Sequence, residues 1–145
     1  MARLLESLTR APADLLRLDY ESRLVRRKRL VTEGGRDVML DLERPTDLGT
    51  YAGLALEDGT EIAVVPADEA VLRVTGDLPR LAWHIGNRHT PCEMTGAALV
   101  IRDDPVLRDM LERLGATIEV DRAPFRPEGG AYGHGRVMGH DHSHD

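Results

Sequence analysis

The sequence has a single cysteine, few aromatic residues and no long apolar run. Because Cys92 is the only cysteine among 145 residues, the chain forms no internal disulfide and no cysteine-rich zinc module. Aromatic residues make up 3% of the chain and hydrophobic residues 41%, so we expect an aliphatic core. Glu6 and Asp14 interrupt the apolar residues at 1–18, which therefore predict neither a signal peptide nor a membrane span. We expect a cytoplasmic protein with no membrane partner.

The chain is also short of positive charge. Its formal net charge of −6 argues against nucleic acid as a main partner. The run Arg26-Arg27-Lys28-Arg29 is an exception, and it lies inside a predicted strand, so its charges should alternate between the two faces. We favour a charged edge strand that is protected against aggregation over a localisation or nucleic-acid signal.

Two β-hairpins are predicted in the first half of the chain. Residues 20–42 alternate with period two around Glu33-Gly34-Gly35, which tolerates the positive φ of a tight turn. Residues 43–66 give a second hairpin that turns at Asp58-Gly59. A proline then ends the last strand, so we expect residues 1–67 to form a small N-terminal β domain.

The second half alternates strands with helices. Asp77 is a good N-cap for a helix that reaches about His89, and a second helix has Asp104 as N-cap, Pro105 at its first position and Gly115 just past its end. Strands are expected on both sides of each helix, at Ala70 to Val74, near Pro91 to Met94, at Gly96 to Ile101 and at Ala116 to Val120.

This order of elements is βαββαβ, which fits a ferredoxin-like domain over residues 68–122. Residues 123–145 are rich in proline and glycine without periodicity, and they predict a flexible, histidine-containing tail. The expected fold class is therefore α+β, with a small β domain, a ferredoxin-like domain and a tail.

Histidines are concentrated at the C-terminal end. His140, His142 and His144 alternate with Asp141 and Ser143, whereas a purification tag would be an unbroken run. Together with His134 they offer imidazole nitrogens to Ni, Cu or Zn. This uncommon composition favours a metal-binding tail over an inert polar terminus.

Three further residues are candidate metal ligands, and each has a structural alternative. From spacing alone, His89 is more often an exposed or capping histidine than a ligand, because one imidazole does not make a metal site. His84 does not share a helical face with His89, so a packing role is favoured. Cys92 is close enough in sequence to His89 to share a soft metal, but a lone cysteine is usually a small buried hydrophobe.

The order of several motifs resembles the UreE family of urease accessory proteins, which are nickel metallochaperones. The motifs are WHIGNRHTPCEM at 83–94, VLRDMLERLG at 106–115 and GGAYGHG at 129–135, preceded by RLVRRKRLVTEGGRDVMLDLERPTDL at 23–48. The GNRH core is short, but its order with the other motifs is specific. The resemblance covers nearly the whole chain.

The resemblance implies a peptide-binding-like N-terminal domain and a homodimer formed through the ferredoxin-like domain. His89 would then meet its symmetry mate at the dimer face, and tail histidines would complete the coordination of Ni(II), with Zn(II) or Cu(II) competing in vitro. The implied partners are a urease accessory GTPase and the urease activation complex. Some relatives carry extra histidines where residues 98–110 have none, so we expect few ions per dimer.

Three other interpretations stay open at this point. The chain could be a metal-independent protein-interaction scaffold, with its histidines incidental, or a tail-based Ni/Zn buffer. A hydrolase that uses Cys92 with His84 or His89 is disfavoured, because no orienting third group or oxyanion-hole motif is present. We therefore expect that the protein is not an enzyme.

Overall fold

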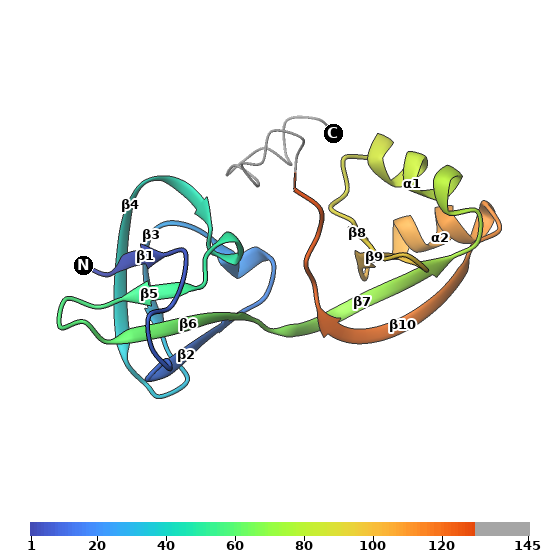
Figure 1. Cartoon of the computed structure of the whole chain (residues 1–145). Coiled ribbons are helices and arrows are strands. Elements are labelled where there is room, and N and C mark those ends of the chain that lie inside the picture. The colour runs from blue at the N-terminus through green and yellow to red at the C-terminus, as the bar shows by residue number, and fades with distance from the viewer. Residues whose placement is uncertain (130–145) are drawn as a thin grey trace. The chain divides into compact units, whose positions relative to one another are not determined.

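The computed structural model describes residues 1–129 of the chain, and the four tail histidines lie outside this range. The described chain divides into two compact units, Met1–Ala67 and Asp68–Glu128. Each unit has its own hydrophobic core. The fold class is α+β as predicted, with a β-rich N-terminal unit and a mixed C-terminal unit (Figure 1).

The N-terminal unit contains two sheets. A four-stranded sheet has the order β1-β5-β6-β2, in which β2 pairs in parallel with β6, and a two-stranded sheet pairs β3 with β4. Its strands are β1 (Arg3–Leu5), β2 (Asp14–Leu18), β3 (Leu24–Val31), β4 (Asp37–Asp47), β5 (Gly53–Ala55) and β6 (Glu61–Pro66). Short 3-10 turns lie at Glu21–Arg23 and Leu48–Thr50.

Both predicted hairpins are confirmed. Strands β3 and β4 are antiparallel on either side of the Gly34-Gly35 turn, and Gly35 has φ 86°. Strands β5 and β6 are antiparallel around Asp58-Gly59, where Gly59 has φ 88°. A left-handed conformation is readily adopted by glycine, and this explains why these two short sequences determine the turns.

The pairing of β3 with β4 is irregular between Val25 and Arg27, where residues 42–45 of β4 lie opposite the single residue Arg26. Val25 and Leu30 are both buried, although an odd number of positions separates them. In a regular strand they would point to opposite faces, so β3 changes its alternation where the pairing is irregular. This irregularity allows β3 to contribute two side chains to one core.

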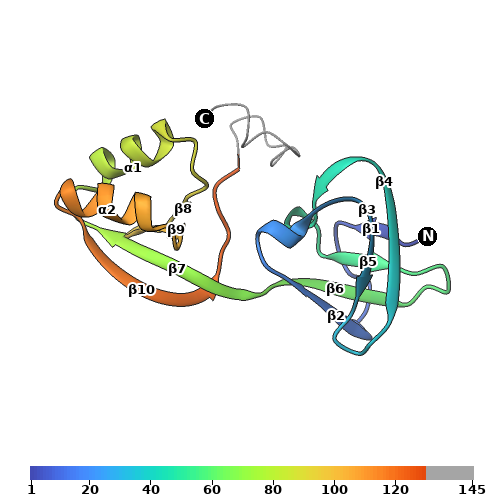
Figure 2. The same ribbon diagram turned by 180° about the vertical axis from the view of Figure 1, so that it is seen from behind.

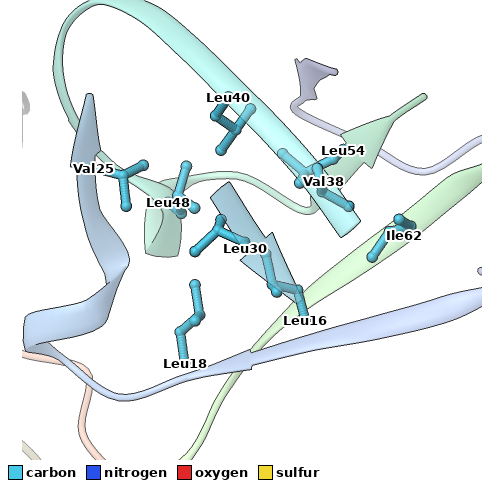
Figure 3. Packing of buried hydrophobic residues seen from close by; sticks show 9 residues of the cluster. All are labelled: Leu16, Leu18, Val25, Leu30, Val38, Leu40, Leu48, Leu54 and Ile62. Atoms are coloured by element: carbon cyan, nitrogen blue, oxygen red, sulfur yellow. The ribbon is translucent and has the colours of Figure 1, made fainter. Parts of the chain in front are cut away.

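One aliphatic cluster joins the two sheets, as Figure 3 shows. Every strand from β2 to β6 contributes to it. Deleting one of these buried side chains should destabilise the unit by about 2–5 kcal/mol, because a cavity remains. Its members are Leu16, Leu18, Val25, Leu30, Val38, Leu40, Leu48, Leu54 and Ile62.

The C-terminal unit is a four-stranded sheet with two helices. Its elements are β7 (Asp68–Thr75), α1 (Leu78–Asn87), β8 (Glu93–Met94), β9 (Leu99–Arg102), α2 (Pro105–Arg113) and β10 (Thr117–Pro124). The strand order is β10-β7-β9-β8 and every pair is antiparallel. Both helices lie on the same face of the sheet (Figures 1 and 2). This confirms the predicted ferredoxin-like βαββαβ arrangement.

Side-chain caps start both helices, as predicted. Asp77 accepts a hydrogen bond from the N–H of Arg80 at 3.4 Å, and Asp104 accepts from the N–H groups of Val106 and Leu107 at 2.9 and 3.2 Å. The apolar side of each helix packs on the sheet. In the part of the chain that the structure describes, no helix is long and apolar enough to span a membrane.

Val106 is 64% exposed, because it lies in the first turn of α2 on the side away from Leu107 and Leu111. The end of this unit differs from the sequence prediction. Strand β10 continues to Pro124, past the predicted start of the tail, and pairs with β7 along its whole length. Its extension is followed by Phe125, which is completely buried.

Residues 125–128 cross from one edge of the sheet to the other. The N–H of Glu128 donates to the carbonyl of Cys92 at 2.8 Å, and that of Arg126 donates to the Glu93 carboxylate at 3.0 Å. Both acceptors belong to the β8 edge, opposite β10. The segment just before the tail is therefore held next to the loop that connects α1 to β8.

A buried carboxylate ties the β3–β4 turn to β2. Asp14, whose side chain is 6% exposed, accepts hydrogen bonds from the hydroxyl of Thr32, from the N–H of Gly34 at 2.9 Å and from the guanidinium of Arg36 at 3.1 Å. A Cβ on Gly34 would lie 2.6 Å from the Asp14 carboxylate, so glycine is needed for this close approach. The bond from Thr32 is the main cause that lowers the pKa of Asp14 to about 2, and it outweighs the opposing effect of burial.

We expect the stability of the protein to fall in acid in a way that Asp14→Asn removes. Because the pKa of Asp14 is lower in the folded state, its carboxylate stabilises the fold fully above about pH 4 and progressively less as the pH falls to about 2. Urea unfolding between pH 7 and 2 measures this loss, with Glu43→Gln, an exposed β4 carboxylate, as the control. An unchanged pH slope in Asp14→Asn would contradict the assignment.

Candidate metal site at the end of helix α1

The GNRH stretch, residues 86–89, forms the C-terminal end of α1. The N–H of His89 donates to the carbonyl of Gly86 at 2.9 Å, and the N–H of Thr90 donates to the carbonyl of Ile85 at 3.4 Å. These two bonds make a Schellman motif, in which the residue just past the helix adopts a left-handed conformation. That residue is His89, with φ 57°, and it is exposed.

Helix α2 ends in the same motif with a different residue. There Gly115 has φ 89°, its N–H donates to the carbonyl of Glu112, and the N–H of Ala116 donates to that of Leu111, both at 3.0 Å. Within residues 1–129, His89 is the only residue other than glycine with a positive φ. The two helices therefore offer an internal comparison of histidine and glycine at one backbone position.

A histidine in this conformation is strained. The Cβ atom of an L-residue approaches the backbone in the left-handed region, at a cost of about 1–2 kcal/mol, whereas glycine has no such penalty. Strain of this kind is concentrated at functional sites. The imidazole of His89 is thus present although the local fold would be better served by glycine.

Two neighbouring side chains on α1 differ in their exposure. Trp83 is 63% exposed, and its ring lies edge-on to the ring of His84, with centroids 5.0 Å apart. His84 is half-buried, in agreement with a packing role. The exposure of Trp83 was not predicted, although its position away from the buried Leu81 and Ile85 is a usable signal.

The described part of one chain does not hold a complete metal site. Among residues 1–129, no three His, Cys, Asp or Glu side chains are grouped so that they could hold an ion. A firm site needs several donors, so His89 of a single chain is one ligand of an incomplete set. The other predicted ligands, His134, His140, His142 and His144, lie outside the described residues.

Cys92 is a poor candidate for a metal ligand. It is half-buried against the core of the C-terminal unit, and its thiol donates weakly to the carbonyl of Glu93 at 3.6 Å. Burial raises the pKa of the thiol to about 11. Since the thiolate is both the ligand and the nucleophile, the packing role is favoured over metal binding or catalysis.

Comparison with known proteins gave matches over both units. A family model described as UreE urease accessory protein, N-terminal domain, matches residues 2–67, and one described as UreE urease accessory protein, C-terminal domain, matches residues 64–145. The chain belongs to the UreE family of urease accessory proteins. The resemblance found in the sequence motifs is thereby confirmed.

Individual relatives agree with the family models. The chain is 57% identical to the urease accessory protein UreE of Rhodobacter capsulatus, over 90% of this chain and 83% of the relative. It is 59% identical to that of Paracoccus denitrificans, over 83% and 77%. UreE proteins are accessory chaperones and not enzymes, so the hydrolase interpretation is excluded. Membership implies a role in urease maturation in a family that binds nickel.

We expect His89→Gly to be more stable than His89→Ala by about 1 kcal/mol, because only glycine relieves the left-handed strain. The matched change Gly115→Ala, at the same position of α2, should lower stability by a similar amount. Urea unfolding of the metal-free proteins measures both differences. Equal stabilities of the two His89 variants would show that the position carries no strain.

Proposed function

We propose that the protein is a cytoplasmic nickel metallochaperone that delivers Ni(II) to the urease activation complex during assembly of the urease metal centre. The observation that carries the proposal is the exposed imidazole of His89 in a backbone conformation that favours glycine. A side chain kept at a cost to stability points to a role in binding. Membership of a nickel-binding family supports nickel as the ion.

The proposed site forms between two copies of the chain. A single His89 is insufficient for tight binding, but a two-fold axis beside it supplies a second imidazole from the same residue of the other subunit. The exposed Trp83 on the same helix offers aromatic surface of the kind that is enriched at protein interfaces. Both residues belong to the unit that would form the dimer.

Tail histidines complete the coordination in this proposal. His134, His140, His142 and His144 close over an ion that the two His89 side chains hold in place. A tail as flexible as the sequence predicts would lose entropy when its histidines bind, so the tail bonds should be the first to release. Replacement of these ligands by those of a urease accessory GTPase or of the activation complex then transfers the ion.

We expect one nickel ion to bind tightly per two chains, as a shared site requires. His89→Ala and His89→Gly should abolish tight binding, whereas a chain that ends before Gly139 should bind more weakly. His84→Ala is the matched control on the same helix and should bind as the unchanged protein does. Isothermal titration and sedimentation of each variant measure affinity, stoichiometry and dimer content.

The same titrations separate the proposal from its alternatives. If truncation of the tail alone removed all binding and His89→Ala had no effect, the protein would be a tail-based Ni/Zn buffer. If a truncated His89→Ala protein still bound its urease accessory partners fully and without metal, it would be an interaction scaffold. Either outcome would overturn the shared site.

We also expect copper to bind at least as tightly as nickel, and zinc to compete. Imidazole sites follow the general order of divalent metals, so selectivity in the cell must come from metal supply and partner recognition. All three affinities should fall as the pH drops through the histidine range, because protons and metal compete for the same nitrogen. Copper binding far weaker than nickel binding would contradict this account of the ligands.

A further inference from the structure

Strand β3 has an open edge. It pairs only with β4 in the described chain, and the two form a sheet of their own. The outer edge of β4 receives at least one bond, from the N–H of Ala2 to the carbonyl of Met39 at 3.2 Å. No strand within residues 1–129 pairs with the other edge of β3, which is 8 residues long. Just past its end, the N–H of Glu33 donates to the carbonyl of Leu15 in β2 at 2.8 Å, so the open part of the edge lies toward the start of β3.

The register determines which backbone groups face outward at this edge. The N–H of Thr32 donates to the carbonyl of Arg36 at 2.9 Å, so Thr32 and Arg36 form a hydrogen-bonded pair. Such pairs alternate with pairs whose N–H and C=O groups point away from the partner strand. Counting back along β3, Arg27 and Arg29 belong to the outward-facing pairs. The outward carbonyl of Met39, which pairs with Arg29, agrees with this assignment.

Four consecutive basic residues cover this edge. Arg26, Arg27, Lys28 and Arg29 are all exposed, whereas the alternation of the strand alone would have turned some of them inward. Arg29 is paired with Asp37 at 2.7 Å. The other three make no ion pair within the part of the chain described here. A protein of net charge −6 thus presents a strongly basic strand edge.

Lys28 helps to prevent this edge from pairing with the same edge of a second copy. It lies directly opposite Leu40, which is fully buried, so its position in the strand faces the core although its side chain is exposed to solvent. A lysine at a core-facing position, irregular strand pairing and a run of like charge are all features that prevent two identical edges from pairing. The same charges attract a strand of opposite sign, so the excluded partner is a second copy and the favoured one is acidic.

We propose that the open edge of β3 binds an extended acidic segment of a partner protein as an added strand. The backbone groups of Arg27 and Arg29 pair with the segment, while Arg26, Arg27 and Lys28 contact its carboxylates. A nucleic acid fits less well, because it would not use the aligned backbone donors and acceptors. This surface belongs to the N-terminal unit, and the proposal does not depend on the nickel site.

The test uses the full chain and a synthetic peptide of alternating glutamate and valine, matched to the 8 residues of β3. Binding is followed by fluorescence anisotropy, and hydrogen exchange is measured for each amide. We expect the amides of Arg27 and Arg29 to exchange more slowly with the peptide bound, while those of Lys28 and Leu30, which face β4, change little. The lysine version of the peptide should not bind.

Two comparisons separate strand addition from simple charge attraction. N-methylation of alternate peptide amides keeps every charge but removes backbone donors, and it should weaken binding by about tenfold. Arg27→Glu should have a similar effect, whereas Arg113→Glu, an exposed reversal of the same charge in the other unit, should not. Because the peptide comparison leaves the protein unaltered, it holds even if Arg27→Glu folds poorly.

Several outcomes would overturn the proposal. Equal binding of the methylated peptide would reduce the edge to a general anion-binding surface. An oligonucleotide that bound more tightly than the acidic peptide would point to nucleic acid instead. Absence of peptide binding at low salt, with β3 folded, would leave the basic run with a protective role alone. In each case the nickel titrations would be unaffected.

Discussion

The Schellman motif that ends helix α1 is the constraint on which the candidate metal site depends. Leu81 and Ile85 bury one side of the helix against the sheet, so the last turn has a defined position. The two Schellman bonds then hold His89 in place at the cost of left-handed strain, and Pro91 prevents the helix from continuing. The backbone that carries the imidazole is thereby fixed, and that reduces the entropy lost when the side chain binds an ion.

In the N-terminal unit, the buried carboxylate of Asp14 stabilises the hairpin that carries the exposed edge of β3. Asp14 bonds to the turn between β3 and β4, and the ribbon on either side of that turn packs its aliphatic side on the four-stranded sheet. With the ribbon held at both places, the far edge of β3 can remain unpaired without losing its strand conformation. The imidazole of one unit and the basic edge of the other are both carried by hydrogen-bonded backbone, which suits them to recognise different partners.

Local sequence determined most of the elements of this fold. Helix starts at Asp77 and Asp104 and the turn at Asp58-Gly59 depend on interactions within a few residues, so they could be predicted without any tertiary information. The order of the elements then indicated the ferredoxin-like unit. Histidine at the end of α1 was also visible, and the motif around His89 indicated its family before any geometry was known.

What only the tertiary structure decided involves contacts between distant segments. Strands β1 and β2 were not predicted, because they are short and their partners β5 and β6 lie far along the chain. The irregular pairing of β3 with β4, the unpaired edge of β3 and the burial of Phe125 likewise follow from packing. The sequence by itself determined which chemistry is available, since residue types and caps act locally. Tertiary structure decided that His89 is exposed and that β3 has an unpaired edge, because both depend on which neighbours fill the space around them.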